Sequence, residues 1–139
     1  MLDLFAGSGS LGIEALSRGA AHATFVESNR DAVRCIERNL ATLGCADRAD
    51  VVEDDALWFV RGCRQQFDLI FADPPYAYEE TRGIPDLVMQ TRVLAPEGYL
   101  LIGHARHLKF TSTAMFTVGP QKTFGRTTVT FFRHPQPTE

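Results

Sequence analysis

Residues 2–12, with the sequence LDLFAGSGSLG, decide the fold. Residues 1–5, which are apolar except for Asp3, predict a short strand, and a glycine-rich turn follows it directly. The apolar periodicity of residues 11–16 then predicts a helix that ends near Gly19, where glycine can adopt the left-handed conformation. A strand, a glycine turn and a helix in this order form a unit that lets a nucleotide-like ligand approach the backbone closely.

Three glycines of this turn, Gly7, Gly9 and Gly12, fit the spacing G-x-G-x-x-G. Glycine is needed in such a turn because a side chain would block the ligand or an unusual φ angle. A second predicted strand, residues 23–26, leads into Glu27, an acid in the position that bonds ribose hydroxyls. The alternative is a tight strand-to-helix turn without a ligand, and the matching acid argues against it.

Two ligand classes use such a turn, and the charges around it favour one of them. A dinucleotide places its pyrophosphate at the helix N-terminus, where positive charge is favourable. S-adenosylmethionine carries a sulfonium and an ammonium group instead, and both favour nearby carboxylates. Asp3, Glu27 and Asp73 are predicted to converge on the turn, and no lysine or arginine lies in residues 1–17. We therefore expect S-adenosylmethionine as the cofactor, although Glu27 alone would serve either ligand.

A further pair of acids follows the third predicted strand, residues 49–53. Asp54 or Asp55 could cap the helix that is predicted over residues 57–65. The C-termini of the strands of an α/β sheet gather around the ligand cleft, however. In that second interpretation Asp55 accepts the exocyclic amine of adenine and Ala56 packs on the ring.

The tetrapeptide Asp-Pro-Pro-Tyr, residues 73–76, follows an apolar strand predicted over residues 67–72. Its adjacent prolines lack N–H groups and make a stiff, extended turn. Asp73 and the carbonyl of Pro74 could accept both hydrogens of a planar amino group while Tyr76 stacks on the ring that carries it. The motif thus predicts a site for an aromatic amine, and the alternative is a simple change of chain direction.

Strand and helix patterns alternate through most of the chain, but the end differs. The remaining predicted elements are helices over residues 30–43 and 79–93, a strand over 99–102 after a turn at 96–98, and a hairpin of 116–124 and 127–133 joined at Gly125. This pattern predicts an α/β, Rossmann-like fold with a mostly parallel sheet, one antiparallel strand and a C-terminal hairpin. We expect one domain over residues 1–134 and a loose tail over 135–139.

Composition narrows the classes of function. At 139 residues and 45% hydrophobic content, the chain suits a single domain with a substantial core. No stretch approaches transmembrane length and no secretory signal is visible, so we expect a cytoplasmic protein without membrane contact. Cys35, Cys45 and Cys63 lack metal-pair spacing, so we expect reduced thiols and no metal.

Charge is distributed unevenly along the chain. The net charge of −3 differs from that of a strong nucleic-acid binder. From Leu101 onward, however, Glu139 is the single acid among several basic residues. Arg106, Lys109, Lys122 and Arg126 follow the fifth predicted strand or flank the hairpin turn, which places them near the rim of the cleft. The alternative for each is ordinary solvated surface.

With both motifs in place, the chain resembles the class I S-adenosylmethionine-dependent methyltransferases, and among them the amino-group enzymes marked by Asp/Asn-Pro-Pro-Tyr. It looks most similar to the bacterial 16S rRNA guanine-N2 methyltransferases of the RsmD type. The matching stretches are residues 2–20, 25–27, 55–56, 73–76 and 124–127. The likeness runs across nearly the whole chain.

The resemblance implies a seven-stranded sheet and carries functional roles onto the matching residues. The residues implied to bind the cofactor are Asp3, Phe5, Ala6, Gly7, Ser8, Gly9, Glu27, Ser28, Asp55, Ala56 and Asp73. Those implied to hold the target amine are Asp73, Pro74 and Tyr76. The implied partner is ribosomal RNA or a small-subunit assembly particle, contacted by Arg106, Lys109, Lys122 and Arg126. We expect a monomer.

Two departures from the family pattern and several alternatives accompany this interpretation. Family members usually carry a basic N-terminal segment, whereas the first predicted strand here begins at Met1, and Gly103 stands where many members have an acid.

The expected reaction is methylation of guanine N2 in 16S rRNA. Adenine N6 in DNA and a protein glutamine present a similar planar amine. A nicotinamide-dependent oxidoreductase also fits the glycine spacing, and a third alternative is a cofactor-binding core that lacks activity without the N-terminal segment.

Overall fold

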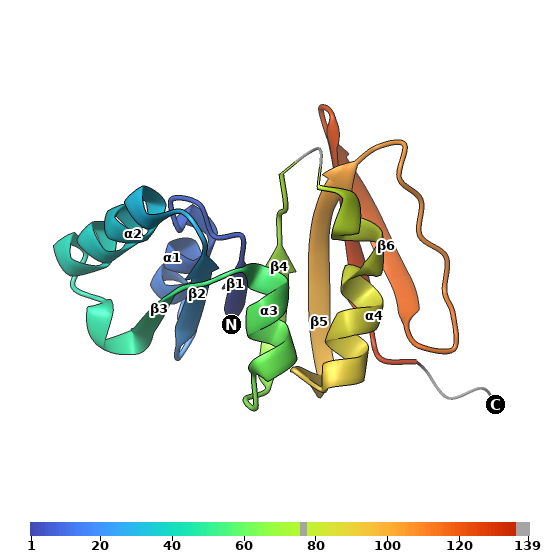
Figure 1. The fold of residues 1–139 in the computed structure, drawn as a ribbon, viewed down its shortest axis with the longest axis horizontal. Coiled ribbons are helices and arrows are strands. Elements are labelled where there is room, and N and C mark those ends of the chain that lie inside the picture. The colour runs from blue at the N-terminus through green and yellow to red at the C-terminus, as the bar shows by residue number, and fades with distance from the viewer. Residues whose placement is uncertain (76–77, 136–139) are drawn as a thin grey trace.

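The computed structural model describes residues 1–75 and 78–135, whose fold is shown in Figure 1. Seven strands in these residues form one sheet in the order β3-β2-β1-β4-β5-β7-β6. The strands are β1 (Leu2–Leu4), β2 (Ala23–Glu27), β3 (Ala49–Glu53), β4 (Phe67–Ala72), β5 (Leu94–Ala105), β6 (Thr117–Phe124) and β7 (Thr127–Arg133). The helices are α1 (Ser10–Ser17), α2 (Arg30–Thr42), α3 (Ala56–Gly62) and α4 (Ile84–Thr91), with short 3-10 helices η1 (Ala46–Arg48) and η2 (Glu79–Gly83).

The strand directions confirm the predicted mixed sheet. Strands β1 to β5 pair with one another in parallel, β7 runs antiparallel to β5, and β6 runs antiparallel to β7. The order changes direction at β1, because the chain builds outward to β3 and then returns to place β4 on the other side of β1. The C-terminal ends of the parallel strands therefore share one edge, where folds of this kind bind their ligands.

Helices cover both faces of the sheet in its β1–β3 half because consecutive strand residues point to opposite faces and are both apolar. Phe25 of β2 packs in one cluster with Leu16 of α1 and Ile36 of α2. Val26, its neighbour in β2, packs in a second cluster with Val60 of α3 and with residues of α4. Figure 1 shows α3 and α4 in front of the sheet. No helix in residues 1–75 or 78–135 is long and apolar enough to cross a bilayer.

Gly12 allows α1 to lie directly on the sheet. A Cβ atom at this position would overlap the ring of Phe25, which is fully buried. We expect Gly12→Ala to lower the free energy of unfolding by about 1–3 kcal/mol, because an overpacked core must shift. Urea denaturation measures the change. Gly62→Ala, at the end of α3 where a Cβ meets nothing within 4 Å, is the matched control, and an equal loss there would contradict this explanation.

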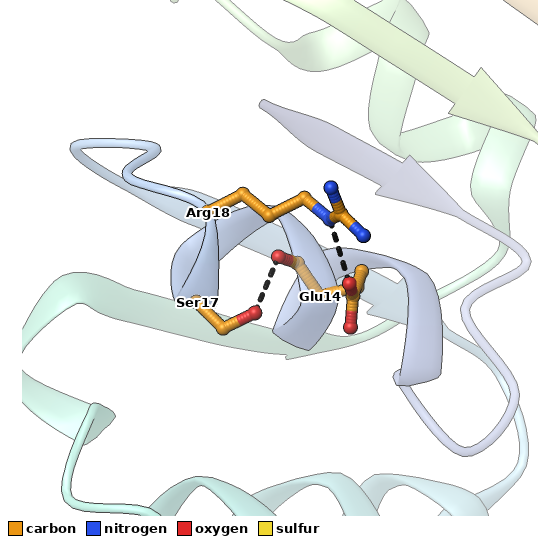
Figure 2. Close-up of polar contacts among 3 residues, drawn as sticks. All are labelled: Glu14, Ser17 and Arg18. Atoms are coloured by element: carbon orange, nitrogen blue, oxygen red, sulfur yellow. Dashed lines mark hydrogen bonds and ion pairs between the residues drawn. The ribbon is translucent and has the colours of Figure 1, made fainter.

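Polar contacts among Glu14, Ser17 and Arg18 lie at the C-terminal end of α1, as Figure 2 shows. Ser17 Oγ donates a hydrogen bond to the carbonyl oxygen of Glu14 at 2.8 Å, and Arg18 Nε donates to Glu14 Oε1 at 2.7 Å. Gly19 follows with a φ of +107°, so the chain leaves the helix at the predicted glycine. Because this ion pair is exposed, it contributes little to stability.

The helix predicted over residues 79–93 is wrong, since η2 and α4 take its place and β5 begins at Leu94. Pro85 explains the break, because it lies in the first turn of α4, where its missing N–H costs no hydrogen bond. In a continuous helix from Glu79, the same proline would remove a hydrogen bond and clash with the preceding turn. The break separates η2, which borders a pocket described below, from the packed helix α4.

Two further bounds differ from prediction. Helix α3 ends at Gly62 instead of residue 65, and β5 covers Leu94–Ala105 instead of residues 99–102. The predicted turn at residues 96–98 lies inside β5, at the irregularity between the pairs Phe67–Leu94 and Leu69–Tyr99. The other predicted strands and helices begin and end within about one residue of the observed bounds.

Candidate functional site

The loop after β1 is held in an unusual backbone conformation at the C-terminal edge of the sheet. Phe5, Gly7 and Gly9 have φ angles of +59°, +58° and +81°. A positive φ is uncommon for a phenylalanine and marks local strain. The Ala6 amide donates to the carbonyl of Val26 at 3.0 Å, which holds the loop against β2. The loop thus presents backbone groups, and few side chains, toward the sheet edge.

Glu27 fixes this loop in place. Its Oε1 accepts a hydrogen bond from the amide of Gly7 at 2.8 Å, and its Oε2 accepts one from the amide of Asn29 at 2.8 Å. Each carboxylate oxygen has a second lone pair. The side chain can therefore anchor the glycine loop and still accept bonds from a ligand hydroxyl.

Asp3 lies beneath the loop. It is 2% exposed, and its Oδ2 accepts a hydrogen bond from the amide of Gly12 at 3.2 Å. Burial, together with the negative charges of Asp73 and Glu27, raises the pKa of Asp3 to about 7. The structure thus brings these acids close enough to interact, with Asp3 behind the loop.

The raised pKa of Asp3 gives a testable pH dependence. Between pH of about 4 and about 7 the folded protein retains a proton that the unfolded chain has lost, because the folded pKa is about 7 and the ordinary value is 3.8. The contribution of Asp3 to stability therefore falls as the pH rises through this window, by at most about 1.4 kcal/mol per pH unit, and is constant above it. We expect urea midpoints to show this slope in the wild type and a smaller slope in Asp3→Asn. Equal slopes would contradict the assignment.

A pocket of about 350 Å³ opens beside the loop, and we call it the glycine-loop pocket. It is lined by Phe5, Gly7, Glu27, Ser28, Asp54, Asp55, Ala56, Asp73, Pro75 and Tyr78. The predicted cofactor residues in this set are Phe5, Gly7, Glu27, Ser28, Asp55, Ala56 and Asp73. They come from the C-terminal ends of several strands, as the sheet topology requires.

Four predicted cofactor residues have other surroundings. Ala6 packs against the hydrophobic cluster that includes Leu16 of α1 and Ile36 of α2. Asp3 is buried beneath the loop. Ser8 is exposed, and its hydroxyl is 2.8 Å from that of Ser10. Gly9 precedes α1, and a Cβ on it would meet Ile36 at 3.0 Å. These residues shape the loop and do not line the glycine-loop pocket.

Asp55 caps α3, as one of the two sequence interpretations predicts. Its Oδ2 accepts a hydrogen bond from the amide of Trp58 at 2.9 Å and so caps α3. Asp55 and Ala56 also line the glycine-loop pocket, and their contact with adenine stays a prediction. Asp54 Oδ1 accepts from the amide of Asp55 at 2.7 Å and holds the turn.

A second pocket, of about 380 Å³, lies against the end of β5, and we call it the β5 pocket. Its lining residues include Asp73, Pro74, Pro75 and Tyr78. Asp73, Pro75 and Tyr78 also line the glycine-loop pocket, so the two pockets share a wall. Tyr76 lies outside the described residues, and its stacking role stays a prediction.

Gly103 permits the close packing of this shared wall. A Cβ atom at Gly103 would lie 2.7 Å from Asp73 Oδ1. The glycine that departs from the family pattern therefore leaves room for the carboxylate at the entrance of the β5 pocket. Burial raises the pKa of Asp73, which makes its carboxylate a better proton acceptor.

Tyr78 is a site residue that the sequence analysis missed. Its ring contacts Phe5 edge to face, with centroids 5.1 Å apart, and its hydroxyl donates to Glu80 Oε2 at 2.9 Å. Burial and the neighbouring Glu80 raise the pKa of Tyr78 well above its usual range, so the phenol keeps its proton. The available signal was an aromatic residue two positions after the tetrapeptide.

None of the predicted basic residues is among the described lining residues of the β5 pocket. Arg106, Lys109, Lys122 and Arg126 are exposed. The arginine and histidine residues that line the β5 pocket are instead Arg82, His104 and His107. Arg82 Nη1 donates to the carbonyl of Lys109 at 3.4 Å and joins η2 to the segment after β5. No pattern in the sequence distinguishes Arg82 from other surface arginines.

His104 forms a buried part of the same wall. One ring nitrogen lies 2.7 Å from Thr130 Oγ1 and the other 2.9 Å from the carbonyl oxygen of Ala105. Burial lowers the pKa of His104, so the ring is neutral near pH 7. Its neutral ring packs edge to face on Phe110, with centroids 5.0 Å apart. No cluster of His, Cys, Asp and Glu in residues 1–75 and 78–135 has the arrangement of a metal site.

Comparisons with known proteins agree with this arrangement. A family model described as Conserved hypothetical protein 95 matches residues 1–133. The Bacillus subtilis protein YlbH is 35% identical over 136 residues, which cover 95% of this chain and 74% of that protein. Ribosomal RNA small subunit methyltransferase D of Haemophilus influenzae is 33% identical over 127 residues, covering 89% of this chain and 66% of that protein.

Solved structures show the same fold. A conserved protein of Streptococcus pyogenes superposes with a TM-score of 0.89 at 30% identity, over 96% of this chain and 84% of that one. A SAM-dependent methyltransferase from Agrobacterium tumefaciens superposes with a TM-score of 0.66 at 16% identity, over 97% of this chain and 55% of that one, which supports the fold alone.

The sheet order, the glycine loop and the pockets at the strand ends define a class I methyltransferase fold. The same segments that build the site, from the glycine loop to the C-terminal hairpin, fall within the matched residues 1–133. The chain belongs to the RsmD family of methyltransferases.

Proposed function

We propose that this chain transfers a methyl group from S-adenosylmethionine to the exocyclic N2 amine of a guanine in 16S rRNA of the small ribosomal subunit. The observation that carries the proposal is the position of Asp73 in the wall of both pockets. One carboxylate thus borders the space for a methyl donor and the space for an acceptor. The name of the Haemophilus influenzae relative supports ribosomal RNA as the substrate class.

The glycine-loop pocket suits a nucleoside that carries positive charge. Glu27, Asp55 and Asp73 line it, and no lysine or arginine is among its lining residues. A Cβ on Gly7 would meet nothing within 4 Å, so the backbone there is open to a ligand. Glu27 would hold the ribose and Asp55 the adenine amine. When bound, S-adenosylmethionine supplies an electrophilic methyl group on a positively charged sulfur.

Asp73 and Pro74 act on the acceptor amine in the β5 pocket. The lone pair of an exocyclic amine is delocalised into its ring, which makes the nitrogen a poor nucleophile. Hydrogen bonds from the amine to the Asp73 carboxylate and the Pro74 carbonyl localise this pair and aim it at the methyl carbon. Alignment of two reactants can contribute roughly 7–11 kcal/mol. The nitrogen must lose a proton after transfer, and the Asp73 carboxylate, with its raised pKa, accepts it.

The pocket arrangement requires an unpaired acceptor base. A base that is stacked and paired inside a duplex cannot present its amine to the Asp73 carboxylate, so the guanine must be unpaired or flipped out of its helix. The described walls of the β5 pocket offer the ring of Tyr78 and the side chains of Thr81 and Arg82 around the base. Tyr76 would stack on its face.

Transfer of a tritiated methyl group tests the proposal. The substrates are small ribosomal subunits and naked 16S rRNA that lack the modification, with duplex DNA and bulk protein in parallel. We expect label in the ribosomal RNA as N2-methylguanine. Label in DNA adenine or in protein glutamine would show that the substrate is DNA or protein and not ribosomal RNA. Calorimetric binding of NAD without binding of S-adenosylhomocysteine would show that the protein is a nicotinamide-dependent enzyme and not a methyltransferase. Binding of the cofactor without methyl transfer to any of these substrates would favour the alternative of a cofactor-binding core that lacks activity.

A further inference from the structure

The β6–β7 hairpin carries an exposed aromatic residue that neither pocket uses. Phe124 is the last residue of β6 and is 64% exposed. Gly125, with a φ of +61°, begins the two-residue turn to Thr127, and this conformation suits glycine. Single exposed hydrophobic residues are common and need no function by themselves. The position of Phe124 and the charges around it distinguish this one.

Strand register places Phe124 beside the β5 pocket. Phe124 pairs with Thr127 of β7, and Thr127 pairs with Ala105 of β5. Directly opposed residues of neighbouring antiparallel strands have side chains on the same face of the sheet, about 5 Å apart. Thr127 and Ala105 both line the β5 pocket. The side chain of Phe124 therefore lies on the same face of the sheet as these two lining residues.

Lys122 lies on the same face, because alternate residues of a strand share a side. It pairs with Val129, which pairs with Gly103, the glycine that makes room for Asp73. These paired residues of β6, β7 and β5 form a row across the sheet, with exposed Lys122 at one end and Gly103, next to the Asp73 carboxylate, at the other. In Figure 1 the turn between β6 and β7 lies at the same end of the sheet as the end of β4, where Asp73 follows.

The hairpin is also uniformly basic. Residues 117–133 contain Lys122, Arg126 and Arg133 and no acid, in a chain whose net charge is −3. An exposed aromatic ring next to lysine and arginine is the combination that binds single-stranded nucleic acid, by base stacking and phosphate contact together. An aromatic site for a protein partner would not require this charge.

We propose that Phe124 is a base-stacking residue for RNA: an unpaired nucleotide next to the target guanine stacks on its ring, while Lys122 and Arg126 contact the adjoining phosphates. This proposal rests on the proposed function and adds the hairpin to the RNA-binding surface. Stacking on Phe124 keeps the RNA single-stranded beside the β5 pocket. In a duplex, pairing would keep the target base out of this pocket. The hairpin positions the RNA and takes no part in methyl transfer.

The test measures binding of a fluorescent single-stranded RNA oligonucleotide to the wild type, Phe124→Ala, Phe124→Trp and Lys122→Ala over a series of salt concentrations. We expect Phe124→Ala to weaken binding by roughly tenfold without changing the salt dependence, since stacking releases no counterions. Phe124→Trp should retain wild-type affinity. Lys122→Ala should weaken binding and lower the slope of log affinity against log salt by about 1.

Leu43→Ala is the matched control, because Leu43 is 63% exposed at the end of α2. It should bind RNA as the wild type does. Unchanged affinity in Phe124→Ala, or an equal loss in Leu43→Ala, would overturn the proposal. If the wild type methylates ribosomal RNA and Phe124→Ala binds normally, only the role of the hairpin is wrong. If the wild type neither binds nor methylates RNA while it binds S-adenosylhomocysteine, both proposals fail.

Discussion

Replacing Asp73 with alanine is expected to lower methyl transfer by roughly 10²–10³-fold, the effect of removing one preorganised polar contact at a reacting centre. S-adenosylhomocysteine should bind with nearly unchanged affinity, since Glu27 and Asp55 remain in the glycine-loop pocket. Single-turnover kinetics with saturating cofactor and calorimetry measure the two effects separately. The partly exposed position of Asp73 makes a folding defect unexpected.

Asp73→Asn separates the roles of hydrogen bonding and proton acceptance. The asparagine carbonyl still accepts one hydrogen of the amine, so transfer should fall less than in the alanine variant. The amide takes up no proton, so the dependence of the rate on pH should flatten on the acidic side. Wild-type rates in Asp73→Ala would show that the carboxylate has no part in the reaction.

Glu27→Ala is expected to weaken cofactor binding by roughly 10²-fold, because two backbone amides lose charge-assisted hydrogen bonds of about 1.5–3 kcal/mol each. The amides of Gly7 and Asn29 would no longer be tied together, and the loop after β1 would lose its fixed conformation. We expect the KM for S-adenosylmethionine to rise far more than kcat falls. Isothermal calorimetry with S-adenosylhomocysteine gives the affinity directly.

Two comparisons make this test specific. Glu27→Gln should lie between wild type and alanine, because its amide oxygen accepts one backbone hydrogen while its amide nitrogen cannot accept the other. Glu53→Ala removes the residue that pairs with Glu27 on the neighbouring strand and that contacts Arg30 at 3.5 Å on the surface. Cofactor affinity should survive that change, and a loss of the same size would mean that general negative charge, rather than loop anchoring, holds the ligand.

Local patterns were enough to predict most of the fold. Several local patterns predicted the backbone conformation that the structure has: the glycine turn after β1, the apolar and β-branched runs, and the turn at Gly125. Tertiary packing did not override these local preferences. The single helix predicted over residues 79–93 is wrong because Pro85 lies in the first turn of a new helix, α4. The long β5 was missed because its irregularity near Gly98 has the composition of a turn, although the segment stays paired with β4.

The site was predictable where residues follow strand ends and less so elsewhere. Glu27, Asp55 and Asp73 could be placed at one edge because parallel strands end there. The burial of Asp3 beneath the loop could not be predicted, since it depends on how α1 packs on the sheet. Tyr78 precedes the short 3-10 helix η2 and Arg82 lies within it, and no periodic pattern in the sequence predicts this helix.

The wall common to the glycine-loop pocket and the β5 pocket has a consequence for inhibitor chemistry. Asp73, Pro75 and Tyr78 border both spaces. Under the proposed reaction, a bisubstrate compound with adenosine joined through a short linker to the N2 of guanine would place its linker at this shared wall. Such a molecule would gain from both recognition surfaces while losing translational freedom only once.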